Sequence, residues 1–239
     1  MSLIYKRILL KVSGEALLGS KEFGIDNEPV EYIANEIKQV HDANVDVAVV
    51  VGGGNIFRGM NKSSKFGMDR ATGDYVGMLA TVMNALALQS AIKATGIDCV
   101  VQSAVQMPQV AEPYIRARAL SHLQKGKVVI FAGGTGNPFF TTDTASALRA
   151  SEILADAMFM AKNGVDGVYS DDPKVNPNAV KIDSMTYDDV IKNNLKVMDT
   201  SACALCKQNN IPIRVFDFKA KGSILKILND EKIGTYIGE

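Results

Sequence analysis

The stretch Val45-Asp46-Val47-Ala48-Val49-Val50-Val51-Gly52-Gly53-Gly54-Asn55 decides the fold class of this chain. Its first seven residues form a β-branched run, which is typical of a strand buried on both faces of a parallel sheet. Three glycines follow, and consecutive glycines are costly in conformational entropy unless the backbone turns tightly or approaches a ligand. The stretch therefore predicts a buried strand that ends either in a simple tight turn or in a turn that binds phosphate.

Similar short runs alternate with helical stretches along the whole chain. We predict strands at residues 7–12, 45–51, 98–103, 127–132, 157–161 and 212–216. We predict helices at residues 29–42, 74–95, 116–124, 143–154 and 199–209, and a hairpin or ordered loop at 165–180. This alternation indicates an α/β fold with a mainly parallel central sheet covered on both faces. With 239 residues, 47% of them hydrophobic, the chain is expected to form one domain over 1–239.

The helix predicted at 74–95 carries an apolar stripe. Its members recur at three- and four-residue steps: Tyr75, Leu79, Val82, Met83 and Leu86. This spacing places them on one side of a helix. We interpret the stripe and its methionines as core packing, with a subunit interface as the alternative for helix faces rich in Ala and Met.

The charge balance excludes a protein that binds its partner through a global electrostatic field. Lys and Arg together number 26, as do Asp and Glu, so no net field attracts nucleic acid or an anionic membrane. No run of consecutive apolar residues approaches the roughly 18 that a membrane helix requires. Anion binding is therefore expected to be local, and the protein is expected in the cytoplasm, with neither nucleic acid nor membrane as a partner.

The three cysteines do not predict a metal centre or a disulfide framework. Cys203 and Cys206 form a C-x-x-C pair, but Cys99 is the only other thiol and the two histidines lack paired spacing. A four-ligand zinc site is therefore not expected, and no protein ligand for a metal is predicted. We interpret the cysteines as small core residues of a reduced protein.

Two further turns follow predicted strands. Lys11-Val12-Ser13-Gly14 comes at the end of the first strand, at the edge where open α/β sheets bind ligands. Lysine is suited to bridging phosphate oxygens. A solvated strand-end lysine is the alternative. Residues 133–143 (GGTGNPFFTTD) combine flexible backbone, hydroxyls, aromatic rings and a carboxylate. Asp143 is then either a helix N-cap or a catalytic residue, and the two roles are compatible.

Neither of the common nucleotide-binding fingerprints is present. The chain has no G-x-x-x-x-G-K-[ST] sequence, which excludes a P-loop, and no G-x-G-x-x-G, which argues against a Rossmann dinucleotide site. Three glycine turns without either fingerprint require another explanation. After the triple glycine, Arg58 is placed to add a bidentate contact to a bound phosphate.

Four segments carry a family resemblance when they are taken together. They are Lys11-Val12-Ser13-Gly14, residues 52–59 (GGGNIFRG), residues 73–85 (GDYVGMLATVMNA) and residues 134–143 (GTGNPFFTTD). These segments closely resemble the bacterial uridylate kinases of the amino-acid-kinase family, and the match spans essentially the whole chain. Residues 163–173 (NGVDGVYSDDP) look like that family's ATP-side loop, in its variant with asparagine first.

The resemblance implies a three-layer α/β/α fold that transfers a phosphoryl group from ATP to UMP in pyrimidine nucleotide biosynthesis, giving ADP and UDP. The implied catalytic residues are Lys11, which bridges the transferred group, Arg58, and Asp143, which orients the lysine. The implied ATP contacts are Lys11, Val12, Ser13, Gly14, Gly54, Arg58, Asn163, Tyr169 and Asp172. The implied UMP contacts are Gly53, Asp74, Thr135, Gly136, Asn137, Pro138, Phe139, Phe140, Thr141 and Thr142.

The resemblance also implies cofactors, assembly and regulation. Mg²⁺ would arrive with ATP and keep several waters. The chain would form a homohexamer, with GTP as activator and UTP as inhibitor. The residues implied in the GTP response are Gly19, Ser20, Lys21, Glu22, Phe23 and Gly24.

Physical chemistry favours the same reaction. Phosphoryl transfer requires positioning and cations more than a covalent nucleophile, and the phosphate of UMP is already ionised at neutral pH. Two alternatives remain: an amino-acid-kinase member that phosphorylates a carboxylate or carbamate, and a non-catalytic nucleotide sensor or storage protein on the same fold.

Overall fold

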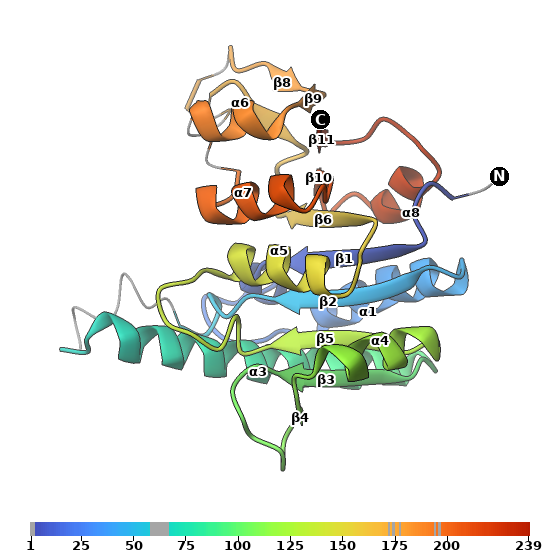
Figure 1. The fold of residues 1–239 in the computed structure, drawn as a ribbon, viewed down its shortest axis with the longest axis vertical. Coiled ribbons are helices and arrows are strands. Elements are labelled where there is room, and N and C mark those ends of the chain that lie inside the picture. Colours follow the sequence, from blue (N-terminus) through green and yellow to red (C-terminus); the bar gives the residue numbers. More distant parts are fainter. Residues whose placement is uncertain are drawn as a thin grey trace.

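Nine strands of the described chain form one sheet (Figure 1), with the order β4-β3-β5-β2-β1-β6-β10-β11-β9. The structure is a computed structural model that describes residues 3–57, 67–171, 173, 175–176, 178–193, 195 and 197–239. The strands are β1 (Arg7–Val12), β2 (Asp46–Val51), β3 (Cys99–Ser103), β4 (Glu112–Pro113), β5 (Val128–Ala132), β6 (Ala157–Lys162), β9 (Ser184–Met185), β10 (Ile213–Asp217) and β11 (Thr235–Ile237). All neighbouring pairs are parallel except β10 with β11, so the predicted mainly parallel sheet is confirmed.

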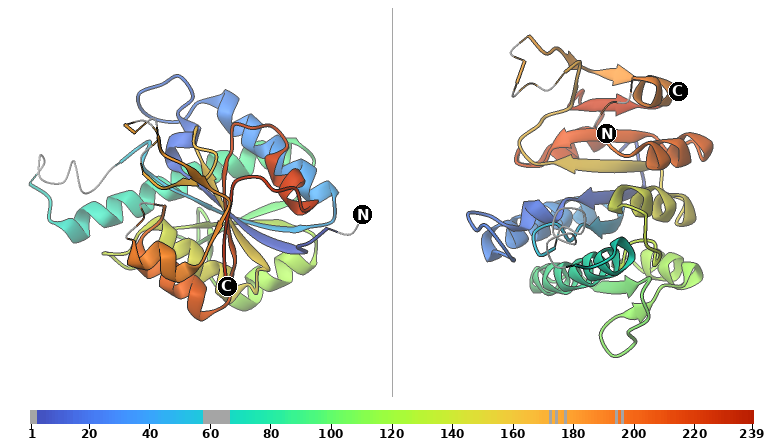
Figure 2. Two further views of the ribbon diagram at one scale, coloured as in Figure 1. Left: turned by 90° about the horizontal axis from the view of Figure 1, so that it is seen from above. Right: turned by 90° about the vertical axis from the view of Figure 1, so that its left-hand side faces the viewer.

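Helices cover both faces of the sheet, as predicted (Figure 2). Helices α1 (Asn27–Asp42), α3 (Arg70–Ala94) and α8 (Ser223–Leu228) lie on one face, and α4 (Arg116–Gln124), α5 (Thr142–Glu152), α6 (Tyr187–Lys192) and α7 (Thr200–Gln208) lie on the other. The short 3₁₀ helix η1 (Gly14–Leu17) follows β1. The α/β/α class is thereby confirmed, whereas the single-domain boundary stays a prediction.

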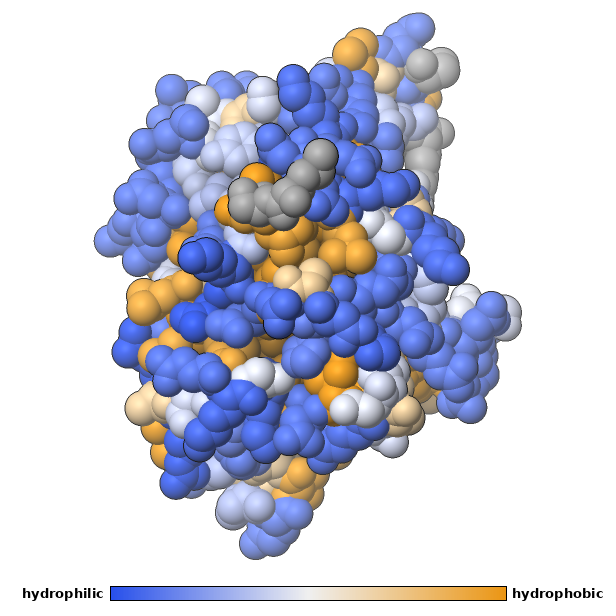
Figure 3. All heavy atoms as spheres, turned by 90° about the vertical axis from the view of Figure 1, so that its right-hand side faces the viewer, coloured by the Kyte–Doolittle hydropathy of each residue, from blue (hydrophilic) through white to orange (hydrophobic). Residues whose placement is uncertain are grey.

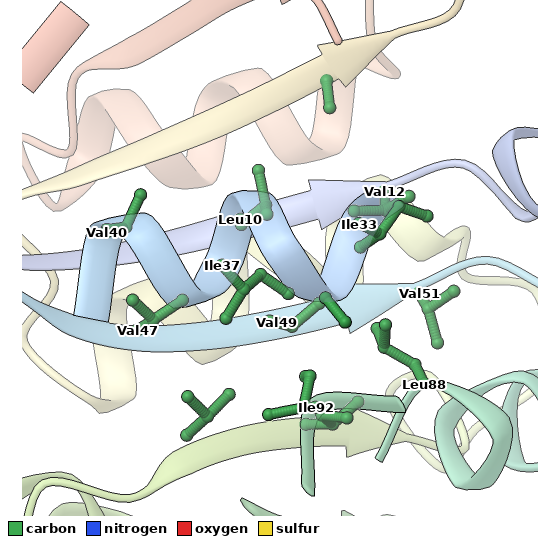
Figure 4. Close-up of a cluster of buried hydrophobic side chains, with 14 of the residues drawn as sticks. Leu10, Val12, Ile33, Ile37, Val40, Val47, Val49, Val51, Leu88 and Ile92 are labelled. Carbon is green, nitrogen blue, oxygen red and sulfur yellow. The ribbon is translucent and has the colours of Figure 1, made fainter. Parts of the chain in front are cut away.

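Successive side chains of the central strands point to opposite faces of the sheet and so divide the core into two clusters. Side chains from β1 and β2, among them Leu10 and Val49, meet Ile37 of α1 on one face (Figure 4). Their sequence neighbours point the other way, because successive side chains of a strand face opposite sides of the sheet. Leu9 therefore packs with the cluster that includes Ala147 of α5. Lys11 belongs to this second set, and so it reaches the α5 side.

Helix α3 corrects one prediction from the sequence. Tyr75, Leu79 and Met83 are exposed by 47%, 48% and 55%, whereas Leu88 and Ile92 are among the residues that face the core. The predicted stripe was wrong for these three residues because α3 is apolar on two sides, and helical spacing alone does not identify the side that meets the sheet. The helix also begins at Arg70, where Asp69 accepts a hydrogen bond from the Thr72 amide at 3.0 Å.

Helix α3 also has the length and apolar composition of a membrane-crossing segment, with a mean hydropathy of 1.4 over its best 18 residues. Its buried side covers the sheet and carries the polar Thr81 and Asn84, so its packing is that of a core helix. On the face shown in Figure 3, hydrophilic residues predominate around smaller apolar patches.

The loop predicted at 165–180 contains one side of a hairpin. β7 (Val168–Tyr169) and β8 (Lys181–Ile182) form a separate antiparallel pair. The prediction of a hairpin is therefore confirmed, with its second strand just beyond the predicted range.

Candidate active site

An ion pair lies at the carboxyl edge of the sheet, where the parallel strands end at the left of Figure 1. Lys11 Nζ is 2.9 Å from Asp143 Oδ1, and the two side chains are only 13% and 18% exposed. Lys11 comes from β1, with β2 on one side and β6 on the other. Asp143 comes from the first turn of α5, where the positive end of the helix dipole favours a carboxylate. The pair therefore holds a cation in place next to the ends of three strands.

Thr141, and not Asp143, is the N-cap of α5. Its Oγ1 accepts hydrogen bonds from the amides of Asp143 at 3.1 Å and Thr144 at 3.2 Å. The N-cap interpretation of Asp143 is therefore wrong. Its carboxylate is left to orient Lys11.

The two glycine turns that follow β1 and β2 pack directly on each other. A Cβ on Gly14 would lie 2.6 Å from Asn55 Oδ1 and 2.7 Å from the Gly52 carbonyl oxygen. A Cβ on Gly53 would lie 2.7 Å from the Gly77 carbonyl oxygen of α3. Close backbone contact thus requires glycine at both positions. Val12, the last residue of β1, is buried. Ser13, which follows it, caps η1 by accepting from the Glu15 amide at 3.4 Å.

A cavity of about 430 Å³ opens between the N-terminal part of α3 and the loop that precedes α5. The predicted site residues that line it are Gly53, Gly54, Asp74, Thr135, Phe140, Thr141 and Thr142. Its wall also includes Arg70 and Met78, which sequence reasoning did not single out. The cavity therefore combines apolar surface, hydroxyl groups and one carboxylate, which suits a nucleotide with its sugar.

Contacts from α3 hold the loop 133–141 in place. Asp74 Oδ2 accepts from the Phe139 amide at 2.7 Å, and Thr81 Oγ1 accepts from the Gly133 amide at 2.8 Å. Phe139 has a φ of 72°, a left-handed conformation that is uncommon for a residue with a side chain. The predicted residues Gly136, Asn137, Pro138 and Phe139 belong to this loop but do not line the cavity.

A buried amide pair connects the glycine turns to the segment 19–24. Asn55 and Asn84 donate to each other's side-chain oxygens, at 3.0 and 2.7 Å. Asn55 Nδ2 also donates to the Gly24 carbonyl at 2.9 Å, and the Gly24 amide donates to the Asn55 carbonyl at 3.0 Å. Asn84 Nδ2 donates to the Gly52 carbonyl at 2.6 Å. The predicted regulatory segment thereby contacts the turn after β2, whose Gly53 and Gly54 line the first cavity.

The rest of that segment lies at the surface. Gly19 packs against Asp26, Ser20 and Glu22 are exposed, and Lys21 Nζ donates to the Ile25 carbonyl at 2.9 Å. Phe23 is one of the exposed large hydrophobic residues.

A second cavity, of about 490 Å³, lies beyond β6 on the other side of β1. Tyr169 lines it, and its hydroxyl donates to Asp166 Oδ1 at 2.6 Å, which raises the pKa of Tyr169. Asn163 is exposed next to the cavity, one residue after Lys162 in its wall. The predicted Arg58 and Asp172 lie outside the described residues. The two cavities therefore flank the strand that carries Lys11.

Sequence reasoning missed several residues that organise this edge. Thr81 and Asn84 are buried polar residues of α3, and no sequence signal marked them, because the sequence does not show which side of this helix meets the sheet. Asp199 caps α7 through the Ala202 amide at 2.7 Å and also accepts from Thr144 Oγ1 at 3.2 Å and from Thr141 Oγ1. Lys162 ends β6 as Lys11 nearly ends β1, and the same strand-end argument would have found it.

The described residues contain no group of three or more His, Cys, Asp or Glu side chains able to hold a metal ion. Burial raises the pKa of the Cys99 and Cys206 thiols to about 12 and that of Cys203 to about 11. The cysteines are free and buried, as expected for core residues.

This sheet, with a lysine on its central strand and a cavity on each side, defines a phosphotransferase of the amino acid kinase class. A model of the amino acid kinase family matches residues 6–217, and the chain belongs to that family.

Solved structures narrow the resemblance to one group. A UMP kinase from Bacillus anthracis is 42% identical over 98% of this chain and 96% of its own, with a TM-score of 0.95. A UMP kinase from Ureaplasma parvum is 36% identical over 98% of this chain and 99% of its own, with a TM-score of 0.92. A uridylate kinase from Archaeoglobus fulgidus is 30% identical over 97% of this chain and 99% of its own, with a TM-score of 0.75. The resemblance noted from the sequence motifs is thus confirmed.

Proposed function

We propose that this chain is a UMP kinase, which transfers the γ-phosphoryl group of ATP to UMP and releases ADP and UDP. The observation that carries the proposal is the Lys11–Asp143 ion pair, which stands on β1 between the two cavities. Close likeness to UMP kinases over nearly the whole chain supports the choice of acceptor.

The first cavity is assigned to UMP. The Asp74 carboxylate can accept from ribose hydroxyls, and Met78 and Phe140 offer apolar surface to the base. Thr141 and Thr142 lie next to Asp143, so the UMP phosphate is directed toward Lys11. The second cavity is assigned to ATP, with Tyr169 in its wall.

In this arrangement an oxygen of the UMP phosphate forms a bond to the γ-phosphorus of ATP. The bond from that phosphorus to the β–γ bridging oxygen breaks, and its electrons leave with ADP. The Lys11 ammonium donates to oxygens of the group in transit, while Asp143 fixes the ammonium in position. No general base is needed, because the UMP phosphate is ionised at neutral pH.

Mg²⁺ is proposed to enter bound to ATP. Mg²⁺ at nucleotide sites is held by one or two carboxylates together with phosphate oxygens and water. When bound, the ion would neutralise charge on the β- and γ-phosphates.

The activity is tested by ADP release with and without UMP. We expect ADP release in a coupled assay with ATP, Mg²⁺ and UMP, and almost none when UMP is omitted. A panel of acceptors that includes CMP, small carboxylates and carbamate separates UMP kinase from other members of the family. Turnover of a carboxylate or carbamate in preference to UMP would contradict the proposal, and so would nucleotide binding without turnover.

We also propose that the chain assembles as a homohexamer in the cytoplasm. The exposed apolar residues Tyr75, Leu79 and Met83 of α3 support a contact between copies, because a contiguous apolar stripe is unfavourable in water. Light scattering should give a hexamer mass for the wild-type chain and a smaller mass for Leu79→Glu. A monomeric wild-type chain would contradict this assembly.

Activation by GTP and inhibition by UTP are proposed to act through residues 19–24. The two hydrogen bonds between Gly24 and Asn55 support this role, because they link the segment to the turn before the first cavity. Initial rates should rise with GTP and fall with UTP. Lys21→Ala should raise the GTP concentration that gives half-maximal activation, and an unchanged value would contradict the assignment.

A further inference from the structure

We propose that Lys162 is a second phosphate-binding lysine of the active site, which contacts the phosphates of ATP opposite Lys11. The inference deepens the proposed function and rests on it. Lys162 lines the second cavity and belongs to the strand next to the one that carries Lys11.

Strand register places Lys162 close to Lys11. β1 and β6 are parallel neighbours, and Lys11 is paired with Met160, so Lys162 lies two residues further along β6. Paired residues face the same side of a sheet, and so do residues two positions apart in one strand. Lys11, Met160 and Lys162 therefore all face the side of α5 and Asp143. With strands ~4.8 Å apart and a rise of ~3.3 Å per residue, the two Cα atoms are about 8 Å apart. That spacing leaves room for a phosphate chain between two long side chains.

Charged groups lie on three sides of Lys162: Lys11 and Asp143 toward the ion pair, and Asp217, its register partner on β10. Burial lowers the pKa of Lys162, the nearby Lys11 lowers it further, and Asp143 acts in the opposite direction. The Asp143 carboxylate pairs with Lys11, so the Lys162 ammonium is partly desolvated close to a second cation. A bound polyphosphate would supply negative charge to both ammonium groups.

The donors of Lys162 are only partly used. Its Nζ donates to the Val197 carbonyl, which lies just before α7. In the described part of the chain it forms no ion pair. An ammonium has three donors, so with respect to the described residues two are left for other acceptors. The Val197 carbonyl therefore positions the ammonium at the cavity wall without neutralising it.

The reaction gives this position a function. As the bond from the γ-phosphorus to the β–γ bridging oxygen breaks, negative charge grows on the ADP that leaves. A lysine on the ATP side of Lys11 is placed to stabilise that charge, while Lys11 contacts the transferred group. Preorganised donors of this kind typically contribute about 10²-fold to turnover.

The alternative is a purely structural lysine that anchors the start of α7. Affinity for ATP compared with adenosine separates the two roles, because only a phosphate contact affects one ligand and not the other. We would measure both affinities by calorimetry for the wild type, Lys162→Met and Lys162→Arg, together with steady-state kinetics and melting temperature. Lys127→Met is the matched control, because Lys127 precedes β5 at the opposite edge of the sheet and pairs with Asp98 at 3.2 Å.

We expect Lys162→Met to weaken ATP binding about tenfold or more, to leave adenosine binding unchanged and to lower kcat by roughly 10²-fold. Lys162→Arg should restore part of the ATP affinity, and Lys127→Met should match the wild type. Equal ratios of ATP to adenosine affinity in Lys162→Met and the wild type would overturn the inference, even if the melting temperature falls.

The inference and the proposed function fail in different ways. If the wild type phosphorylates UMP and Lys162→Met retains both its kcat and its ATP-to-adenosine ratio, the inference is overturned and the function stands. If the wild type binds ATP but does not phosphorylate UMP, the function is overturned and the affinity ratio still decides the role of Lys162. If the wild type does not bind ATP, both are overturned.

Discussion

Lys11 Nζ lies 2.9 Å from Asp143 Oδ1, and this pair joins the central strand of the sheet to the first turn of α5. Each partner is held by regular structure, so the cation has little freedom to move away from the strand ends. Pairing offsets part of the cost of burying each charge.

Replacing Lys11 by methionine keeps most of the side-chain volume but removes the charge. We expect Lys11→Met to lower kcat by at least about 10²-fold, as is typical when one preorganised donor is lost. Steady-state rates of ADP release with saturating ATP and UMP measure the effect, and Lys127→Met is the control. A Lys11→Met enzyme with wild-type kcat would rule out the assigned role.

A double-mutant cycle tests whether Asp143 acts through Lys11. Asp143→Asn should lower kcat on its own, because the ammonium is no longer held in place. The same change in a Lys11→Met background should have little further effect, since the group it orients is already gone. Fully additive losses in log kcat would show that Asp143 acts independently of Lys11.

A substitution at Asp74 should affect the two nucleotides differently. Asp74→Asn should raise the KM for UMP by about tenfold while the KM for ATP changes little, because Asp74 lines the first cavity only. The asparagine oxygen can still accept from the Phe139 amide, so the loop should keep its conformation. Equal increases in both KM values would argue against a ribose contact.

Two glycines at the first cavity should respond differently to alanine. A Cβ on Gly53 would meet the Gly77 carbonyl oxygen at 2.7 Å, whereas a Cβ on Gly77 meets nothing within 4 Å. Gly53→Ala should lower the free energy of unfolding by about 1–3 kcal/mol through overpacking. Gly77→Ala, inside helix α3, should leave it unchanged or raise it by up to about 1 kcal/mol.

Urea unfolding followed by circular dichroism gives both values. If Gly53→Ala is as stable as Gly77→Ala, the close contact between the β2 turn and α3 is not rigid.

The cysteines should be unreactive in the folded protein. Because burial raises the pKa of Cys99 and Cys206 to about 12 and of Cys203 to about 11, almost no thiolate exists at pH 8. A thiol reagent should therefore label the chain only after denaturant is added. Rapid labelling of the native protein would contradict the burial of these residues.

The same shifts predict how stability depends on pH. Each folded-state pKa lies above the ordinary value of 9.0, so above pH 9 the folded state holds protons that the unfolded chain releases. This contribution to the free energy of unfolding is complete below pH 9 and is lost as the pH rises toward 12. Replacing the cysteines by alanine should reduce the loss of stability between pH 9 and 11.

The central strands could be predicted from the sequence because their signal is local. Strand 7–12 was predicted with the bounds that β1 has, since a short apolar run that ends in a Ser-Gly turn is sufficient to identify a buried parallel strand. Lys11 followed from the rule that ligands bind beyond strand ends. The short strands β4, β9 and β11 were missed because two or three residues carry no periodicity.

The contacts between segments could not be predicted in the same way. Which side of α3 meets the sheet depends on packing, and the exposed Leu79 and the buried Leu88 look alike in the sequence. The cap of α5 illustrates a second limit, because Thr141 and Asp143 are both good capping residues and only the backbone geometry selects Thr141. Lys162 directly follows the predicted strand 157–161, so the rule that identified Lys11 applies to it as well, and its omission was not a limit of the sequence.

The reciprocal amide pair of Asn55 and Asn84 constrains how this sequence can change over time. All four N–H groups of the two side chains are used, on each other's oxygens and on the Gly24 and Gly52 carbonyls. Replacing either asparagine alone leaves buried donors and acceptors of the other without partners, which costs more than the bonds are worth. We therefore expect related chains either to keep both asparagines or to replace both of them.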